Sequence, residues 1–157
     1  MRTGIGYDIH PLAPGRPLVL AGVQIEHAAG LLGYSDADVL SHAVIDALLG
    51  AAALGDIGTH FPPGDPQYKD ARSIDLLRRT VAFVNAQGYR IVNVDSTVIA
   101  QAPRLAPHVE ALRSSLAGAL GVEAGAVSVK AKSADHLGAI GRGEGIAALA
   151  IDLLDSP

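Results

Sequence analysis

Three side chains that metal ions favour stand out in the first third of the chain, namely Asp8, His10 and His42. Residues 3–10 read as a strand, and because successive side chains of a strand alternate between faces, Asp8 and His10 would point to the same side. The apolar Ile9 between them indicates that the opposite face is buried. Two ligands from a strand and a third from elsewhere leave an open fourth position, which for zinc is the catalytic arrangement. We therefore predict a metal centre here.

His42 lies in residues 37–54, where the sequence predicts a helix. Asp38, His42 and Asp46 are spaced by four and so line one side of that helix, next to a stripe of alanine and valine. We interpret Asp38 as a helix cap, and Asp46 as the acceptor of the proton on the second ring nitrogen of His42. A single histidine on such a helix is more often a core residue, but its coincidence with the Asp-x-His pair favours a ligand.

Other candidates have weaker patterns. Asp56 follows Gly55, so it is either part of a helix-stop turn or a carboxylate that accepts hydrogen bonds from substrate hydroxyls. The glycine-rich residues 138–145 contain Arg142 but lack the order of a dinucleotide or P-loop fingerprint. Lys132 and Ser133, at the end of an expected strand, carry groups that suit phosphate oxygens.

Composition restricts the class of protein. The 157 residues fit a single domain, residues 1–157, and the 49% hydrophobic content is compatible with a large shared interface. A net charge of −4 argues against non-specific binding to nucleic acid, and the lack of cysteine leaves imidazole and oxygen as metal ligands. The sequence has no apolar run of the roughly 20 residues that span a bilayer and no signal-peptide core, so we expect a cytoplasmic protein without a membrane partner.

The elements that must position these residues follow from periodicity and turn signals. Pro17 to Ile25 predicts a hairpin that turns at Ala21-Gly22, and Ser35 with Asp38 predicts a capping box for the helix that Gly55 ends. The further expected elements are strand 2–10, a proline-rich loop 56–69, helix 73–87, strand 89–100, helix 107–120, and strands 127–132 and 145–154. This mixture favours an α+β fold with a mixed sheet.

Four blocks together resemble one family: GYDIH at 6–10, SDADVLSHAVIDALLGAAALGDIG at 35–58, AQAPRLAPH at 100–108 and GRGEGIA at 141–147. They look like 2-C-methyl-D-erythritol 2,4-cyclodiphosphate synthase, a lyase of the non-mevalonate isoprenoid pathway, and the match runs in order over the whole chain. The resemblance implies a mixed four-stranded sheet with helices packed on one face. It also implies a homotrimer, with the sheets around a central channel and the active sites between subunits.

The implied reaction is an intramolecular phosphoryl transfer. The substrate is 4-diphosphocytidyl-2-C-methyl-D-erythritol 2-phosphate, whose 2-phosphate attacks the β-phosphorus, releases CMP and closes a cyclic diphosphate. By position, Asp8, His10 and His42 would hold one zinc ion per subunit, and Asp135 would hold a magnesium or manganese ion with the substrate diphosphate. Tyr34 and Ser133 would be the catalytic residues.

The resemblance also implies which residues touch ligands. Besides Asp8 and His10, the substrate would be bound by Tyr34, Ser35, Asp56, Ile57, Gly58, Phe61, Asp65, Ala100, Gln101, Ala102, Pro103, Arg104, Leu105, Ala106, Lys132, Ser133, Asp135, Ala139 and Arg142. Residues 100–106 would form the cytidine pocket, largely with backbone groups. Arg142 would face the central channel, where the family can hold an isoprenoid diphosphate.

Five positions depart from the usual family pattern. Tyr34 stands in place of a histidine, and Asp135 in place of a glutamate, which is one methylene longer. Ser133 replaces threonine, and Ala139 replaces phenylalanine. Pro63 replaces an aspartate, so a carboxylate and a backbone donor are lost. Two alternatives stay open at this point: a metal-assisted phosphohydrolase that uses the same three ligands, and a non-catalytic trimer that binds isoprenoid diphosphate.

Overall fold

A five-stranded sheet forms the centre of the computed structural model, which describes residues 1–156. Its strand order is β4-β1-β7-β5-β6, where the strands are β1 (Arg2–Pro14), β4 (Ala29–Leu31), β5 (Arg90–Ile99), β6 (Val127–Lys132) and β7 (Gly145–Asp155). Only β5 and β6 run parallel, so the predicted mixed α+β sheet is confirmed. The predicted number of four strands is wrong, because β1 continues to Pro14 and there pairs with the short β4.

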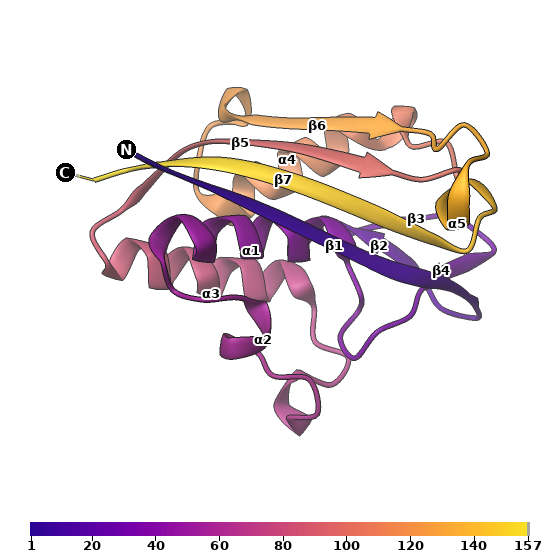
Figure 1. Cartoon of the computed structure of the whole chain (residues 1–157), viewed down its shortest axis with the longest axis horizontal. Coiled ribbons are helices and arrows are strands. Elements are labelled where there is room, and N and C mark those ends of the chain that lie inside the picture. The colour runs from indigo at the N-terminus through magenta and orange to yellow at the C-terminus, as the bar shows by residue number, and fades with distance from the viewer. Residues whose placement is uncertain (157) are drawn as a thin grey trace.

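Three long helices cover one face of this sheet, as Figure 1 shows. They are α1 (Val39–Ala52), α3 (Ser73–Ala86) and α4 (Val109–Leu120). Helix α1 packs on β1 and β7, α4 packs on β6, and α3 packs on both helices, so the apolar core lies between the helices and the sheet. Short helical turns occur at η2 (Ala106–His108), η3 (Ala124–Ala126) and α5 (Gly138–Gly141).

The hairpin predicted for residues 17–25 is confirmed and forms a small sheet of its own. Strands β2 (Leu18–Leu20) and β3 (Val23–Ile25) are joined at Ala21 and Gly22, whose φ angles are +49° and +72°. Two successive residues with positive φ are what a tight hairpin turn needs, because their twist matches that of the paired strands.

Helix α1 begins and ends differently from the prediction. Its N-cap is Asp38, whose carboxylate accepts a hydrogen bond from the Ser41 N–H, so the interpretation of Asp38 as a cap is confirmed and the capping box assigned to Ser35 is wrong. At its other end Ala53, with φ +57°, closes the helix two residues before Gly55. Ala53 adopts the left-handed conformation that usually favours glycine, which is why the glycine signal misplaced the end.

The segment 56–69 is not the plain loop that its prolines predicted. It contains α2 (Ile57–His60) and the 3₁₀ turn η1 (Pro66–Tyr68). Asp56 and Asp65 cap these turns, accepting hydrogen bonds from the backbone of Thr59 and of Gln67. The segment extends below the helical layer in Figure 1.

Glycines on β1 allow α1 to lie directly against the strand. A Cβ atom added to Gly4 would lie 1.9 Å from the carbonyl oxygen of Ala47, and one added to Gly6 would lie 1.9 Å from that of Ala43. Only glycine fits at such a separation. Because side chains alternate along a strand, Asp8 and His10 share the face of these two glycines and so face the same helix.

The other face of the sheet is uncovered in the single chain. Ile5, Tyr7, Ile9 and Ile151 are 68%, 52%, 45% and 51% exposed. The expectation that the face carrying Ile9 is buried is therefore wrong for one chain. Within residues 1–156, every helix is too short or too polar to cross a membrane.

Candidate active site

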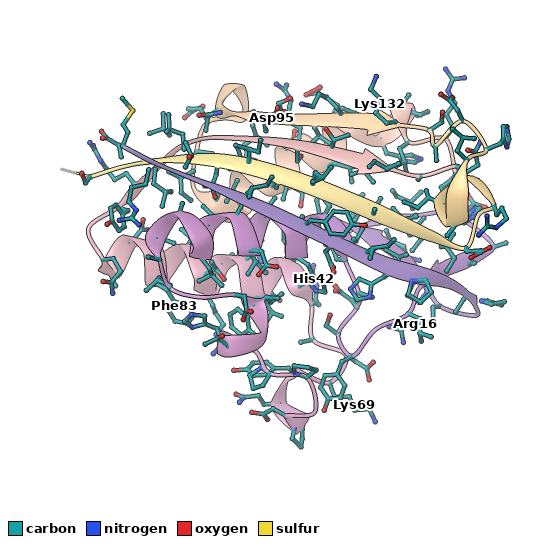
Figure 2. The ribbon with its side chains drawn as sticks, in the orientation of Figure 1. Arg16, His42, Lys69, Phe83, Asp95 and Lys132 are labelled. Carbon is teal, nitrogen blue, oxygen red and sulfur yellow. The ribbon has the colours of Figure 1, made fainter. Side chains whose placement is uncertain are left out.

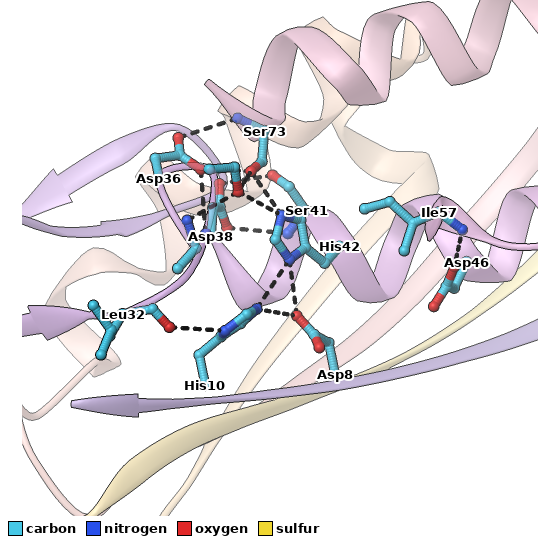
Figure 3. Close-up of polar contacts among 12 residues, drawn as sticks. Asp8, His10, Leu32, Asp36, Asp38, Ser41, His42, Asp46, Ile57 and Ser73 are labelled. Atoms are coloured by element: carbon cyan, nitrogen blue, oxygen red, sulfur yellow. Dashed lines mark hydrogen bonds and ion pairs between the residues drawn. The ribbon is translucent and has the colours of Figure 1, made fainter. Parts of the chain in front are cut away.

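Asp8, His10 and His42 converge where β1 passes the first turns of α1 (Figure 3). The Asp8 Oδ2 atom lies 2.9 Å from His10 Nε2 and 2.9 Å from His42 Nδ1, and the two nitrogens are 3.2 Å apart. In a tetrahedral zinc site with bonds of about 2.0–2.1 Å, neighbouring ligand atoms lie about 3.3–3.4 Å apart. The three atoms therefore already form one face of a coordination shell around a small cation.

The other ring nitrogen of each histidine has its own partner. His10 Nδ1 lies 3.1 Å from the carbonyl oxygen of Leu32, which can only accept, so Nδ1 carries a proton, and the proton between Nε2 and Asp8 is the one that a metal would displace. His42 Nε2 lies 2.8 Å from Ser73 Oγ, and Ser73 Oγ donates to the carboxylate of Asp36. Hydrogen bonds of this kind fix ring orientation and tautomer at metal sites.

Asp46 does not have the role predicted for it. Its carboxylate accepts a hydrogen bond of 2.7 Å from the Ile57 N–H, eleven residues further along the chain. His42 Nε2 donates its hydrogen bond to Ser73 Oγ instead, so the predicted hydrogen bond from His42 to Asp46 is wrong. Asp46 on α1 is instead hydrogen-bonded to the first residue of α2. Partial burial raises the pKa of its carboxyl group.

The electrostatics of the triad favour an ionised carboxylate. Burial would raise the pKa of Asp8, but the hydrogen bonds and charges of His10 and His42 outweigh burial and lower this pKa to about 2. The pKa of His10 is raised, first by its hydrogen bond to Asp8. An anionic oxygen between two imidazoles is a donor set with two nitrogens and one oxygen, which suits zinc in the absence of thiolates.

A pocket of about 260 Å³ opens on this triad. Several residues predicted to bind substrate line it, and the full lining is Asp8, His10, Tyr34, Ser35, His42, Ile57, Gly58, Phe61, Pro63, Tyr68 and Leu76. The wall formed by residues 57–76 is mostly apolar, whereas the triad lies on the opposite, polar side. Such a pocket suits a ligand with a charged end and a carbon skeleton.

A second pocket, also of about 260 Å³, collects the residues predicted for cytidine. It is lined by Ala100, Gln101, Pro103, Arg104, Leu105, Ala106, Ala131, Lys132 and Ser133. The segment leaves β5 and turns through a cis peptide bond between Ala102 and Pro103. Figure 2 shows Lys132 at the end of β6, away from His42 on α1. The two groups of predicted substrate-binding residues thus occupy separate pockets of one chain.

The remaining predicted site residues do not line the metal pocket. Ser133 Oγ donates to Asp135 Oδ1 over 2.9 Å, and Asp135 has a positive φ of +48°. Arg142 is exposed and pairs with Glu144. Ala139 lines a third cavity, together with Ile9, His10, Pro11, Ile140, Glu144 and Gly145. Asp56 and Asp65 use their carboxylates as caps within their own turns.

Three residues that the sequence did not single out belong to the site. Ser73 and Asp36 continue the hydrogen bonding of His42, and Tyr68 forms part of the apolar wall. Ser73 lies 31 residues from His42 at the start of α3, so no local spacing pattern links the two. The sequence places Ser73 at the start of a predicted helix, but a serine there is also common as a helix cap and so does not indicate a partner for His42.

Comparison with known proteins identifies the family. A model described as the YgbB family matches residues 1–155. A 2-C-methyl-D-erythritol 2,4-cyclodiphosphate synthase from Moorella thermoacetica is 60% identical, over 98% of this chain and 94% of its own.

Solved structures agree with this result. One is 2C-methyl-D-erythritol-2,4-cyclodiphosphate synthase in its CDP-bound form, with a TM-score of 0.91, 36% identity, and coverage of 98% of this chain and 100% of that one. Another is a bifunctional protein from Campylobacter jejuni, with a TM-score of 0.96 and 42% identity. The match covers 99% of this chain and 42% of that longer chain.

Proposed function

The chain belongs to the YgbB family and has the 2-C-methyl-D-erythritol 2,4-cyclodiphosphate synthase activity of its relatives, and we propose that it performs this reaction at Asp8, His10 and His42. The reaction is that of a phosphorus–oxygen lyase in isoprenoid biosynthesis. The observation that carries the proposed location is the convergence of these three ligand atoms at the mouth of the pocket.

In the reaction, an oxygen of the substrate's 2-phosphate forms a bond to the β-phosphorus. The bond from that phosphorus to the oxygen of the α-phosphate breaks, so CMP leaves with the electron pair. Zinc held by the triad would act as a Lewis acid on a β-phosphate oxygen. Because the nucleophile is part of the substrate, the chain need only bind, orient and neutralise charge.

On the phosphate side, we propose roles for Tyr34, Lys132, Ser133 and Asp135. Tyr34 lines the metal pocket and can donate its hydroxyl proton in a hydrogen bond to the transferring phosphate. Ser133 and Lys132, at the end of β6, offer a hydroxyl and a cation to the diphosphate. The exposed carboxylate of Asp135 suits magnesium or manganese, since such ions keep several waters and need only one or two carboxylates.

We propose that the two pockets divide the substrate between them. The cytidine would occupy the pocket at residues 100–106, and the solved relative in its CDP-bound form supports a nucleotide site in this fold. The methylerythritol would lie against Ile57, Gly58 and Phe61, with its hydroxyls held near Asp56. This division requires the two pockets to face each other.

A homotrimer would bring such pockets together across subunits. The uncovered sheet face, with Ile5, Tyr7, Ile9 and Ile151, is the kind of apolar surface that assembly buries. Residues 1–157 would then act as one catalytic domain per subunit, located in the cytoplasm. Arg142 and the cavity at Ala139 would border a central channel that can take an isoprenoid diphosphate.

The decisive experiment follows CMP release from 4-diphosphocytidyl-2-C-methyl-D-erythritol 2-phosphate, with zinc present and after chelation. We expect CMP and a cyclic diphosphate in equal amounts, both lost on chelation and restored by zinc. A ring-opened product would indicate a phosphohydrolase instead. Zinc-loaded protein that binds the substrate without releasing CMP would contradict the proposal and favour a binding protein.

A further inference from the structure

The apolar wall of the metal pocket is built from two aromatic rings. Phe61 and Tyr68 are 5% and 7% exposed, and their ring centroids lie 5.5 Å apart in an edge-to-face arrangement. Both rings belong to the segment of short turns that runs from Asp56 to Lys69, whose own backbone hydrogen bonds are few and local. Something outside the segment must therefore hold the wall in place.

The guanidinium of Arg79 packs against both rings from outside the pocket. Its Cζ atom lies 5.1 Å from the centroid of Phe61 and 5.5 Å from that of Tyr68, within the range of a cation–π contact. One of its nitrogens also donates to Tyr68 Oη over 3.4 Å. Unlike Arg78, which pairs with Asp75, Arg79 forms no ion pair with a carboxylate of residues 1–156. The guanidinium of Arg79 instead contacts the rings of Phe61 and Tyr68.

Helix α3 presents Arg79 between two other contacts to the same segment. Leu76, three residues earlier, lines the pocket, and Phe83, four residues later, stacks on Phe61 with centroids 6.2 Å apart. Residues at these spacings lie on one face of a helix. Figure 2 shows Phe83 beside α2. Arg79 and Phe83 on this face of α3 thus contact the segment, and Leu76 borders the same pocket.

His60 completes the contact at the far end. Its ring lies 5.2 Å from Phe83, and its Nε2 lies 2.8 Å from the carbonyl oxygen of Leu54, which accepts the hydrogen bond. The backbone oxygen of His60 accepts from Tyr68 Oη over 3.5 Å. These contacts anchor the end of α2, whereas the Arg79 side chain lies over both rings of the wall.

We propose that Arg79 is a positioning residue that holds Phe61 and Tyr68 as a fixed wall of the metal pocket. The proposal rests on the proposed function, because the wall faces the space left for the carbon skeleton of a ligand whose phosphate lies at the triad. Arg79 touches neither the metal ligands nor that space. It acts through the rings, so its loss weakens the binding of substrate more than the chemical step.

Kinetics of CMP release by the zinc-loaded protein test this effect. Arg79→Ala is expected to raise KM roughly three-fold or more, since an exposed cation–π contact is worth about that factor, and to leave kcat within about two-fold. Arg79→Lys keeps the charge but not the planar group, and should recover part of the loss. Arg78→Ala is the matched control, because it removes a neighbouring exposed arginine from the same helix and should leave both constants unchanged.

A spectroscopic measurement tests the wall without any turnover. The sequence has only two phenylalanines, Phe61 and Phe83, so 4-fluorophenylalanine labelling gives two ¹⁹F signals, and a Phe83→Leu variant assigns them. Arg79→Ala should shift or broaden the Phe61 signal of the ligand-free protein, whereas Arg78→Ala should not. An unchanged Phe61 signal or an unchanged KM in Arg79→Ala overturns the proposal. Failure of the unmodified protein to release CMP would instead count against the proposed function, since the ¹⁹F result still reports on the wall.

Discussion

His42 Nε2 lies 2.8 Å from Ser73 Oγ, and through that serine the histidine is linked to the carboxylate of Asp36. The link joins α1, the start of α3 and the loop before α1 at one point (Figure 3). With a proton held on Nε2, His42 can give up the proton between Nδ1 and Asp8 to a cation and bind that cation through Nδ1. The tautomer that metal binding would need is therefore favoured by Ser73, which is not one of the three candidate ligands.

Replacing Ser73 by alanine should weaken zinc binding. Outer hydrogen-bond partners of metal-bound histidines typically contribute a factor of about 10–100 in affinity, and Ser73→Ala removes the nearer partner of His42. Competition with a zinc chelator measures the change. Ser128→Ala, on the exposed side of β6, is the control and should bind zinc like the unmodified protein. Equal zinc affinities in both variants would show that Ser35 Oγ, 3.2 Å from His42 Nε2, is sufficient to orient the histidine.

His42→Ala should remove most of the bound zinc, whereas Asp38→Asn should keep it and lose stability. Asp38 is fully buried, and its carboxylate accepts hydrogen bonds from the backbone of Ala21, Gly22 and Ser41 and from the Ser41 hydroxyl. It therefore connects the hairpin turn to the start of α1. Leaving part of this network unsatisfied should cost about 2–3 kcal/mol of unfolding free energy.

Metal analysis and urea denaturation separate these two effects. The zinc content of folded Asp38→Asn should stay at that of the unmodified protein, while its denaturation midpoint falls. Equal zinc loss in the folded Asp38 and His42 variants would show that Asp38 is more than a cap.

Changing Tyr34 to histidine should raise turnover. Tyr34 lines the metal pocket and is partly exposed, and its hydroxyl can donate one hydrogen bond but carries no positive charge. A histidine there adds a cation when it is protonated, which would stabilise the charge on the transferring phosphate. The measurement is kcat for CMP release, and Tyr34→Phe, which lacks any donor, should lower it. No difference between the three proteins would exclude a role for this side chain in the reaction.

The buried carboxyl group of Asp152 should make stability fall as pH rises. Asp152 is 1% exposed on β7, and neither carboxylate oxygen has a hydrogen-bond partner in residues 1–156. Burial raises its pKa from 3.8 to about 7, with a smaller opposing influence from the backbone of Gly4. Between these two values the folded chain binds more protons than the unfolded chain. The contribution of Asp152 to the free energy of unfolding is therefore most favourable below about pH 4 and is lost as pH rises through about 7.

Asp152→Asn should remove that dependence and be more stable than the unmodified protein at pH 8. The pKa shift of Asp152 corresponds to a change of about 4 kcal/mol in the free energy of unfolding, at 1.36 kcal/mol for each pKa unit. Urea denaturation at pH 5 and pH 8, at one protein concentration, measures it. Asp155→Asn removes an exposed carboxylate from the same strand and should keep the pH dependence. A stability that is equal at both pH values in the unmodified protein would contradict the assignment.

Local pattern was enough for most of the secondary structure. The hairpin at Ala21-Gly22 and the helix expected at residues 73–87 were confirmed, because turn chemistry and helical spacing act over a few residues. The cap at Asp38 was predicted from its residue type, but the end of α1 was misjudged because Ala53 holds the left-handed position that glycine commonly takes. The fifth strand was missed because β4 has only three residues and exists through its pairing with β1.

For the site, the sequence by itself determined which residues could bind a metal. Asp8, His10 and His42 follow from alternation along a strand and from residue chemistry, and the blocks around them indicated the family. Their closeness depends on Gly4 and Gly6, which let α1 approach β1, and the partner of His42 depends on where α3 begins. Tertiary structure alone decided that Ser73 rather than Asp46 orients His42, and that Arg79 faces Phe61 and Tyr68. The physical reason is that such contacts join segments distant in sequence, and their geometry is set by helix packing rather than by any local spacing.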